Sequence, residues 1–132
     1  MNISDYNFLG YKVSKICFDI DDRFDFSKAE FEQNISVGRG LSVDDKRFVE
    51  VKLNVKINSK DQLLKIEVEM KGGFKANPEM TDEMFEKLSS QNAPAIMYPF
   101  LRAIVASFSS QAGIPSIIMP LMNFTQKQEK IE

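Results

Sequence analysis

The chain has 132 residues, of which 43% are hydrophobic and 27% charged, and a formal net charge of -2. The length predicts one domain, and the composition excludes a chain that is disordered throughout. The slightly negative charge also argues against a nucleic-acid-binding surface, because phosphate binding leaves a basic footprint.

The chain contains no histidine, and Cys17 is its only cysteine. Histidine is the commonest general base and a principal zinc ligand, so we expect no enzymatic activity, no metal site and no cofactor. A lone cysteine agrees with a reducing compartment, and residues 1–10 are polar and mixed, unlike a signal peptide. The sequence therefore predicts a cytoplasmic protein without membrane insertion.

The first predicted strand, around residues 11–20, changes its alternation part-way. Tyr11 and Val13 share one face, whereas the apolar residues from Ile16 onward share the other, so we expect a β-bulge near Ser14 or Lys15. Residues 21–32 then form a charged loop with three phenylalanines, Phe24, Phe26 and Phe31. A loop of this kind must fold its rings onto another surface.

Three more strands are predicted, the first of them short, at residues 33–39. Apolar and polar residues alternate strictly over 48–58 and again over 64–70, with a polar turn at 58–61 between them. This pattern is typical of an antiparallel hairpin with one wet face, on which opposite charges can pair across the strands. Gly72-Gly73 is expected to end the fourth strand.

Two helices are predicted after the strands. Asn77 or Thr81 can cap a short amphipathic helix, and a second helix is expected to start at Pro94. Pro99 should interrupt this helix near Tyr98 because it lacks an N–H donor. The second helix has two apolar faces, which predicts packing against the sheet of its own subunit and against a second subunit.

The C-terminal part of the chain carries a family resemblance. Residues 97–102 (Met-Tyr-Pro-Phe-Leu-Arg), 113–115 (Gly-Ile-Pro) and 119–124 (Met-Pro-Leu-Met-Asn-Phe) resemble the C-terminal signature of the SecB protein-export chaperone family. The order of the strands, the Gly-Gly pair and the short helix extends the resemblance over most of the chain. It implies an α+β fold, in which a four-stranded antiparallel Greek-key sheet has C-terminal helices packed on one face, assembled as a homotetramer (a dimer of dimers).

The resemblance also implies a function. SecB-like proteins are ATP-independent holdases that bind unfolded polypeptides, including preproteins for Sec export, in an apolar groove, and export members deliver them to the SecA motor. The residues implied for client binding are Phe24, Phe26, Phe31, Met84, Phe85 and Phe124. The residues implied for the interface between dimers are Met97, Phe100, Leu101, Ile104, Val105 and Phe108. Asp19 matches one acidic residue of the SecA-binding face.

The chain departs from the family pattern at several places. Gln111 stands where a basic residue is usual, and Ile114 replaces an aromatic residue. The domain is expected to cover residues 1–124, followed by a charged, frayed tail at 125–132 in place of the family's second long helix and its SecA-binding tail. Two alternatives stay open: a dedicated chaperone of one client, such as the antitoxin of a toxin-antitoxin module, or an adaptor without a polypeptide groove.

Overall fold

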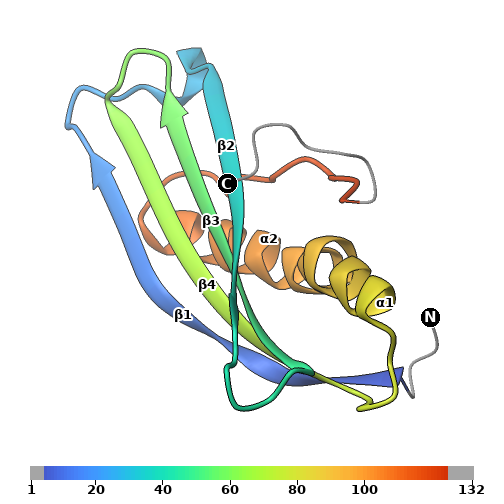
Figure 1. Cartoon of the computed structure of the whole chain (residues 1–132). Helices are drawn as coiled ribbons and strands as arrows, with labels where there is room; N and C mark the ends of the chain where they lie inside the picture. The colour runs from blue at the N-terminus through green and yellow to red at the C-terminus, as the bar shows by residue number, and fades with distance from the viewer. Residues whose placement is uncertain (1–4, 125–132) are drawn as a thin grey trace.

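The computed structural model describes residues 5–124. It is built on a four-stranded antiparallel sheet in the order β1-β4-β3-β2 (Figure 1). The strands are β1 (Tyr6–Ile20), β2 (Phe31–Leu41), β3 (Phe48–Ser59) and β4 (Leu64–Ala76). Strands β2, β3 and β4 follow one another as neighbours and β1 lies beside β4, which is a Greek-key order. The predicted fold class is confirmed.

One face of the sheet is covered by helical structure (Figure 1). Helix α1 (Asp82–Lys87) is capped by the Thr81 side chain, which accepts a hydrogen bond from the backbone N–H of Met84. A π-helical turn, η3 (Leu88–Asn92), joins it to the long helix α2 (Ala93–Gln111). A single 3-10 turn, η2 (Phe26–Lys28), lies in the connection from β1 to β2.

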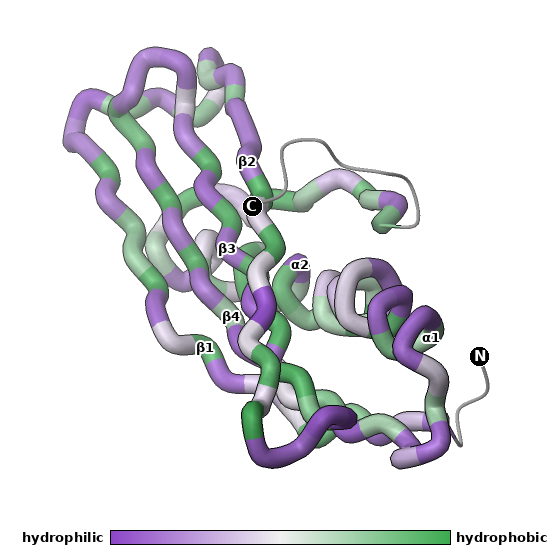
Figure 2. Tube along the Cα trace, viewed as in Figure 1, coloured by the Kyte–Doolittle hydropathy of each residue, from purple (hydrophilic) through white to green (hydrophobic). Residues whose placement is uncertain are grey.

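The core lies between α2 and the sheet. Apolar and polar residues alternate along β3 and β4 (Figure 2), and the apolar ones are buried. Helix α2 contributes Met97, Leu101 and Val105, none of which retains exposed surface. Burial of a large apolar side chain stabilises the fold by about 1.5–3 kcal/mol. No helix within residues 5–124 is long and apolar enough to cross a membrane.

Strand β1 contains two shifts of register against β4. One falls between Val13 and Lys15, as the change of alternation predicts. The other falls between Phe8 and Tyr11, where Gly10 has a φ of 102°. A residue with a side chain rarely adopts this conformation, so glycine suits the second shift.

The expectation that Gly72-Gly73 ends the fourth strand is wrong, because β4 continues to Ala76. Gly72 instead makes room for helix α2. A Cβ atom at this position would lie 2.9 Å from the sulfur of Met97 and 3.3 Å from the ring of Phe8. The glycine therefore serves close packing of helix on sheet.

The expected interruption at Pro99 is also absent, because α2 is continuous through it. Proline removes the N–H that would bond to the carbonyl of Ala95. Both Ala95 and Pro99 are exposed, so water can satisfy this carbonyl. The buried side chains on the opposite face of α2 hold the helix against the sheet.

Candidate functional site

An aromatic cluster forms where β1 crosses over to β2. It consists of Phe24, Phe26 and Phe31, whose ring centroids lie 5.5–6.3 Å apart. The 3-10 turn η2 shapes this connection, and Asp25 caps the turn by accepting a hydrogen bond from the N–H of Ser27. All three rings are partly buried and pack against the core, so each keeps some exposed surface. The loop thus presents aromatic surface on a fixed backbone.

The segment after α2, residues 112–124, turns back along the helix, and we call it the C-terminal return. Polar side chains of α2 bind its backbone at three points. The Tyr98 hydroxyl donates to the carbonyl of Pro120, and Arg102 Nε donates to the carbonyl of Met119 over 3.0 Å. The Ser109 hydroxyl accepts from the N–H of Ile117 over 3.0 Å. These bonds fix an extended segment that belongs to neither helix nor sheet.

The return lies beside β2 (Figure 1). Burial raises the pKa of the Tyr98 phenol, and an interaction with Gln33 of β2 opposes this shift. The phenol of α2 therefore lies near both β2 and the return. On the return, Ile117 and Met119 are buried.

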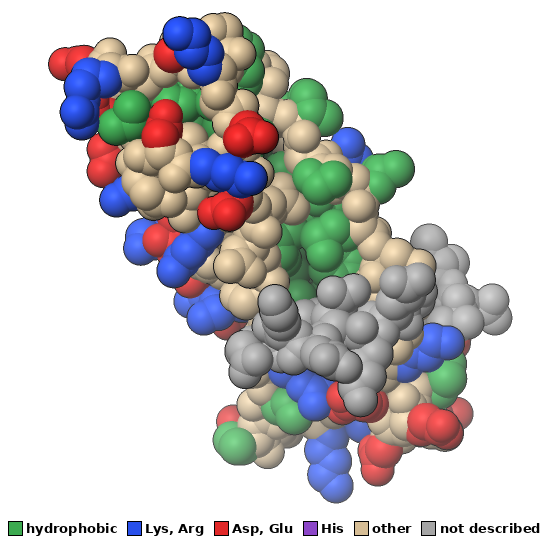
Figure 3. Space-filling view, turned by 90° about the horizontal axis from the view of Figure 1, so that it is seen from above, with side chains coloured by type: hydrophobic (Ala, Val, Ile, Leu, Met, Phe, Trp, Pro, Cys, Tyr) green, Lys and Arg blue, Asp and Glu red, His purple; other side chains and the backbone are tan. Residues whose placement is uncertain are grey.

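The same return exposes other apolar side chains. Ile118 is 70% exposed and Leu121 is 82% exposed. Figure 3 views the end of the molecule where β1 finishes and β2 begins, and it shows apolar side chains gathered in a hollow of this surface. Among residues 5–124, the crossover loop and the return thus each keep exposed apolar side chains.

The residues implied for client binding are not equally placed. Phe24, Phe26 and Phe31 keep exposed surface, and Met84 lines a separate shallow pocket of about 310 Å³ beside α1. In contrast, Phe85 and Phe124 are only 7% and 4% exposed. Arg47 lies over the ring of Phe85, and Tyr98 packs edge-on against Phe124. Both rings are parts of the core, so a client reaches them only if the fold opens.

The residues implied for the subunit interface divide in the same way. Met97, Leu101 and Val105 face the chain's own sheet and have no exposed surface to offer a second subunit. Ile104 is partly exposed, while Phe100 and Phe108 are each 42% exposed. The Phe100 ring packs against Tyr11 of the edge strand β1 at 5.1 Å between centroids. An unpaired apolar surface therefore runs from α2 onto β1, where Val13 and Ile16 are also exposed.

Asp19 lies elsewhere, on the face of the sheet turned away from α2, which we call the outer face. It sits opposite Lys65 of β4. Charges on this face pair across strands as expected: Lys15 lies 3.0 Å from Glu67, and Lys52 lies 3.9 Å from Glu69. Hydrogen bonds from Asn54 and Lys15 lower the pKa of Glu67, and a hydrogen bond from the Ser14 hydroxyl lowers that of Glu69.

Comparisons with known proteins agree with the fold described above. A family model described as preprotein translocase subunit SecB matches residues 24–130, most of the chain. The chain belongs to the SecB family. The protein-export protein SecB of Rickettsia typhi is 31% identical over 106 residues, which cover 74% of this chain and 69% of that protein. SecB of Anaplasma phagocytophilum is 33% identical over 52 residues, 39% of this chain and 33% of that protein. The matches thus span from one third to about two thirds of these relatives.

Solved structures agree with the SecB-family fold. A SecB-like chaperone of Mycobacterium tuberculosis, solved in complex with a ChAD peptide from the HigA1 antitoxin, superposes with a TM-score of 0.74. The likeness covers 90% of this chain and 88% of that one at 9% identity, which supports the fold alone. A Streptococcus agalactiae protein of unknown function superposes with a TM-score of 0.51 at 8% identity.

Sequence reasoning missed the attachment of the C-terminal return in this SecB-family chain. The signal was present, because Arg102 is the only charged residue between Lys87 and Lys127. A single charge in an apolar segment needs a specific partner. That partner is a backbone carbonyl 17 residues away, which no pattern along the chain identifies.

Proposed function

We propose that this SecB-family chain is an ATP-independent holdase that binds unfolded polypeptides through the aromatic cluster and the exposed side chains of the C-terminal return. The observations that carry the proposal are the partial exposure of Phe24, Phe26 and Phe31 in the crossover loop and the high exposure of Ile118 and Leu121 on the return. Exposed apolar side chains that the fold does not bury are typical of sites that receive other chains.

The physical basis is nonspecific apolar contact with an extended chain. A buried aromatic ring removes about 150–250 Å² from water, and its binding demands little of the partner's sequence. Several weak contacts on one oligomer raise the overall affinity, because each further contact becomes intramolecular. No bond is made or broken, so the proposal assigns binding and no catalysis.

Two finer assignments belong to this proposal. One is export: preprotein clients would pass to the SecA motor, with Asp19 of the outer face as a contact. The other is a narrow client range, favoured by the peptide of an antitoxin bound to the structurally similar mycobacterial SecB-like chaperone. A broad holdase protects many unrelated clients, whereas a dedicated chaperone protects one.

Light scattering tests the proposal directly. The purified protein is measured alone and with an excess of reduced, carboxymethylated α-lactalbumin, a permanently unfolded chain. We expect the mass to rise with the unfolded chain and to stay constant with native α-lactalbumin. Adding purified SecA to the loaded complex tests export. An oligomer that ignores the unfolded chain would contradict a general holdase and leave the dedicated chaperone.

Substitution of the aromatic cluster tests the site. Phe24→Ala combined with Phe26→Ala should weaken binding of the unfolded chain by about tenfold or more, because two rings lose their contact area. Leu41→Ala is the matched control, since Leu41 is 58% exposed at the far end of β2. Circular dichroism of both variants checks that the fold is kept. Equal binding by the double variant and the control would contradict the cluster's role.

A further inference from the structure

The outer face of the sheet carries a row of three lysines across neighbouring strands. Lys12 of β1 lies opposite Lys71 of β4, and Lys71 lies opposite Lys52 of β3. Like charges directly opposite one another destabilise a sheet. Folding alone gives no reason for this arrangement, which suggests that the row serves another purpose.

The row is only partly neutralised within the described residues. Lys52 lies 3.9 Å from Glu69, and this carboxylate also accepts a hydrogen bond from Ser14. Neither Lys12 nor Lys71 has a carboxylate within 4 Å among residues 5–124. Glu69 also attracts Lys71 at longer range, so the ammonium groups of Lys12 on β1 and Lys71 on β4 are at most partly neutralised within these residues.

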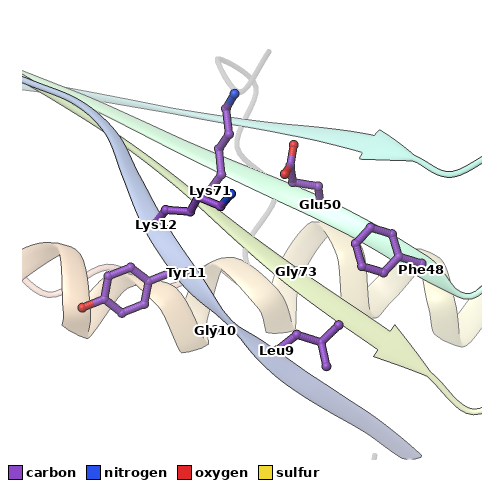
Figure 4. Close-up of a pocket in the computed structure, with 8 residues that line it drawn as sticks. All are labelled: Leu9, Gly10, Tyr11, Lys12, Phe48, Glu50, Lys71 and Gly73. Carbon is purple, nitrogen blue, oxygen red and sulfur yellow. The ribbon is translucent and has the colours of Figure 1, made fainter.

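A shallow pocket of about 290 Å³ adjoins the lysines. Figure 4 shows Leu9 and Phe48 on either side of Gly73, with Lys12 and Lys71 beyond them toward the other side of the pocket. Gly73 forms the floor of the pocket and has no side chain to fill it. A Cβ at this position would lie 3.6 Å from the Phe48 ring and 3.8 Å from Leu9. Leu9 is 59% exposed and lies in the same pocket as Lys12 and Lys71.

We propose that this pocket binds a short acidic segment of a partner polypeptide, in which an apolar side chain sits over Gly73 and a neighbouring carboxylate pairs with Lys12 and Lys71. Charge complementarity selects this occupant. Glu50 borders the pocket on the β3 side, so the carboxylate is directed toward β1. The pocket lies on the outer face, away from α2 and separate from the proposed client surface.

A nucleic acid fits these observations less well. The outer face intersperses its lysines with Glu50, Glu67 and Glu69, and the chain has a net charge of -2. Phosphate binding requires several basic contacts along a backbone. The apolar walls formed by Leu9 and Phe48 also have no role in holding phosphate, whereas they suit an apolar side chain.

The experiment uses the full chain and a synthetic probe, the acetylated and amidated peptide Gly-Asp-Phe-Glu-Gly, followed by NMR. We expect shifts at the amides of Leu9, Lys71 and Gly73 that saturate with the peptide and weaken as salt is added. The peptide Gly-Asn-Phe-Gln-Gly, which lacks the carboxylates, and the peptide Gly-Asp-Ala-Glu-Gly, which lacks the ring, should each bind more weakly.

Two double variants distinguish a specific effect of the lysine row on binding from an effect of net charge. Lys12→Gln combined with Lys71→Gln should weaken binding of the acidic probe by about tenfold, since each exposed ion pair contributes up to about 1 kcal/mol. The same double variant should unfold at a higher temperature than the wild type, because it removes a repulsion. Lys56→Gln combined with Lys65→Gln is the control, with the same charge change elsewhere on the outer face.

Three results would overturn the proposal. The first is no saturable shift at Leu9, Lys71 and Gly73. The second is equal affinity for the acidic and amide probes, or an equal loss of affinity for the acidic probe in the two double variants. The third is tighter binding of a single-stranded oligothymidylate at the same amides, which would assign the row to nucleic acid. Holdase activity of the Lys12 and Lys71 variant should stay unchanged, so this test is independent of the proposed function.

Discussion

Two adjacent glycines on β4 have different roles although the sequence presents them as a pair. Gly72 faces α2, where a Cβ would lie 2.9 Å from the Met97 sulfur. Gly73 faces outward, where a Cβ would find contacts of 3.6 Å and longer. Strand alternation places neighbouring residues on opposite faces, so one glycine permits packing and the other forms the floor of a surface pocket.

This difference predicts opposite responses to the same substitution. Gly72→Val should lower the free energy of unfolding by about 1–3 kcal/mol, because the added methyl groups overpack the contact with Met97. Gly73→Val should be neutral or slightly stabilising, since valine favours strands. Urea denaturation of the two variants measures both effects. Equal free energies of unfolding would show that the close approach of α2 to Gly72 is relieved without cost.

At the scale of elements, α2 joins the sheet and the C-terminal return. Its buried apolar face packs on the sheet, whereas Tyr98, Arg102 and Ser109 bind the backbone of the return. The helix leads directly from the π-helical turn η3, so α1 and α2 form one helical unit. The return is an extended segment held by side chains, and its position depends on a few hydrogen bonds.

Tyr98→Phe tests this attachment. Loss of the hydrogen bond to Pro120 should lower the free energy of unfolding by about 0.5–1.5 kcal/mol at neutral pH. Tyr11→Phe is the matched control, because Tyr11 is a partly exposed tyrosine on β1 whose ring packs on Phe100. Urea denaturation gives the free energies, and hydrogen exchange at Ile117 and Met119 reports on the return. Unchanged exchange would contradict an anchoring role.

The stabilisation that the Tyr98 hydrogen bond gives should depend on pH. Burial raises the pKa of Tyr98 in the folded chain above the ordinary tyrosine value of about 10. The folded state therefore holds this proton more tightly than the unfolded state, and the resulting stability is present below pH 10 and lost as the pH rises through the raised pKa. The difference in stability between the wild type and Tyr98→Phe should accordingly narrow above pH 10. A constant difference would show that Tyr98 does not titrate in this range.

At the scale of the whole molecule, the subunit leaves one apolar side uncovered. Phe100 and Phe108 of α2 and Val13 and Ile16 of β1 are exposed. Strand β1 is also an edge of the sheet, and edges of this kind pair readily with other chains. We therefore expect the chain to self-associate, and the predicted homotetramer remains a prediction.

Phe108→Glu tests self-association through α2. A charge at this position should reduce the mass of the oligomer in light scattering, because burying an unpaired carboxylate in an interface costs several kcal/mol. Ser107→Glu is the control, with the same charge at a neighbouring exposed position of the helix. Circular dichroism should match the wild type for both variants. A full-size oligomer from Phe108→Glu would place the interface elsewhere.

The sequence alone determined the sheet, because strict alternation along β3 and β4 leaves one register that buries the apolar face. It also determined the bulge near Ser14 and the family, through the motif around Pro99 and the segment that ends at Phe124. Local patterns of this kind are set by neighbours along the chain.

Only the tertiary structure decided which apolar residues of α2 are available to other chains. Met97, Leu101 and Val105 share helical spacing with Ile104 and Phe108, and spacing alone cannot say which side faces the sheet. The structure buries the first three completely and leaves Phe108 partly exposed. The reason is that three features depend on contacts between segments far apart in the sequence. They are the burial of side chains on α2, the role of Gly72 and the hydrogen bond of Arg102. Those contacts exist only when the sheet, the helix and the return have come together.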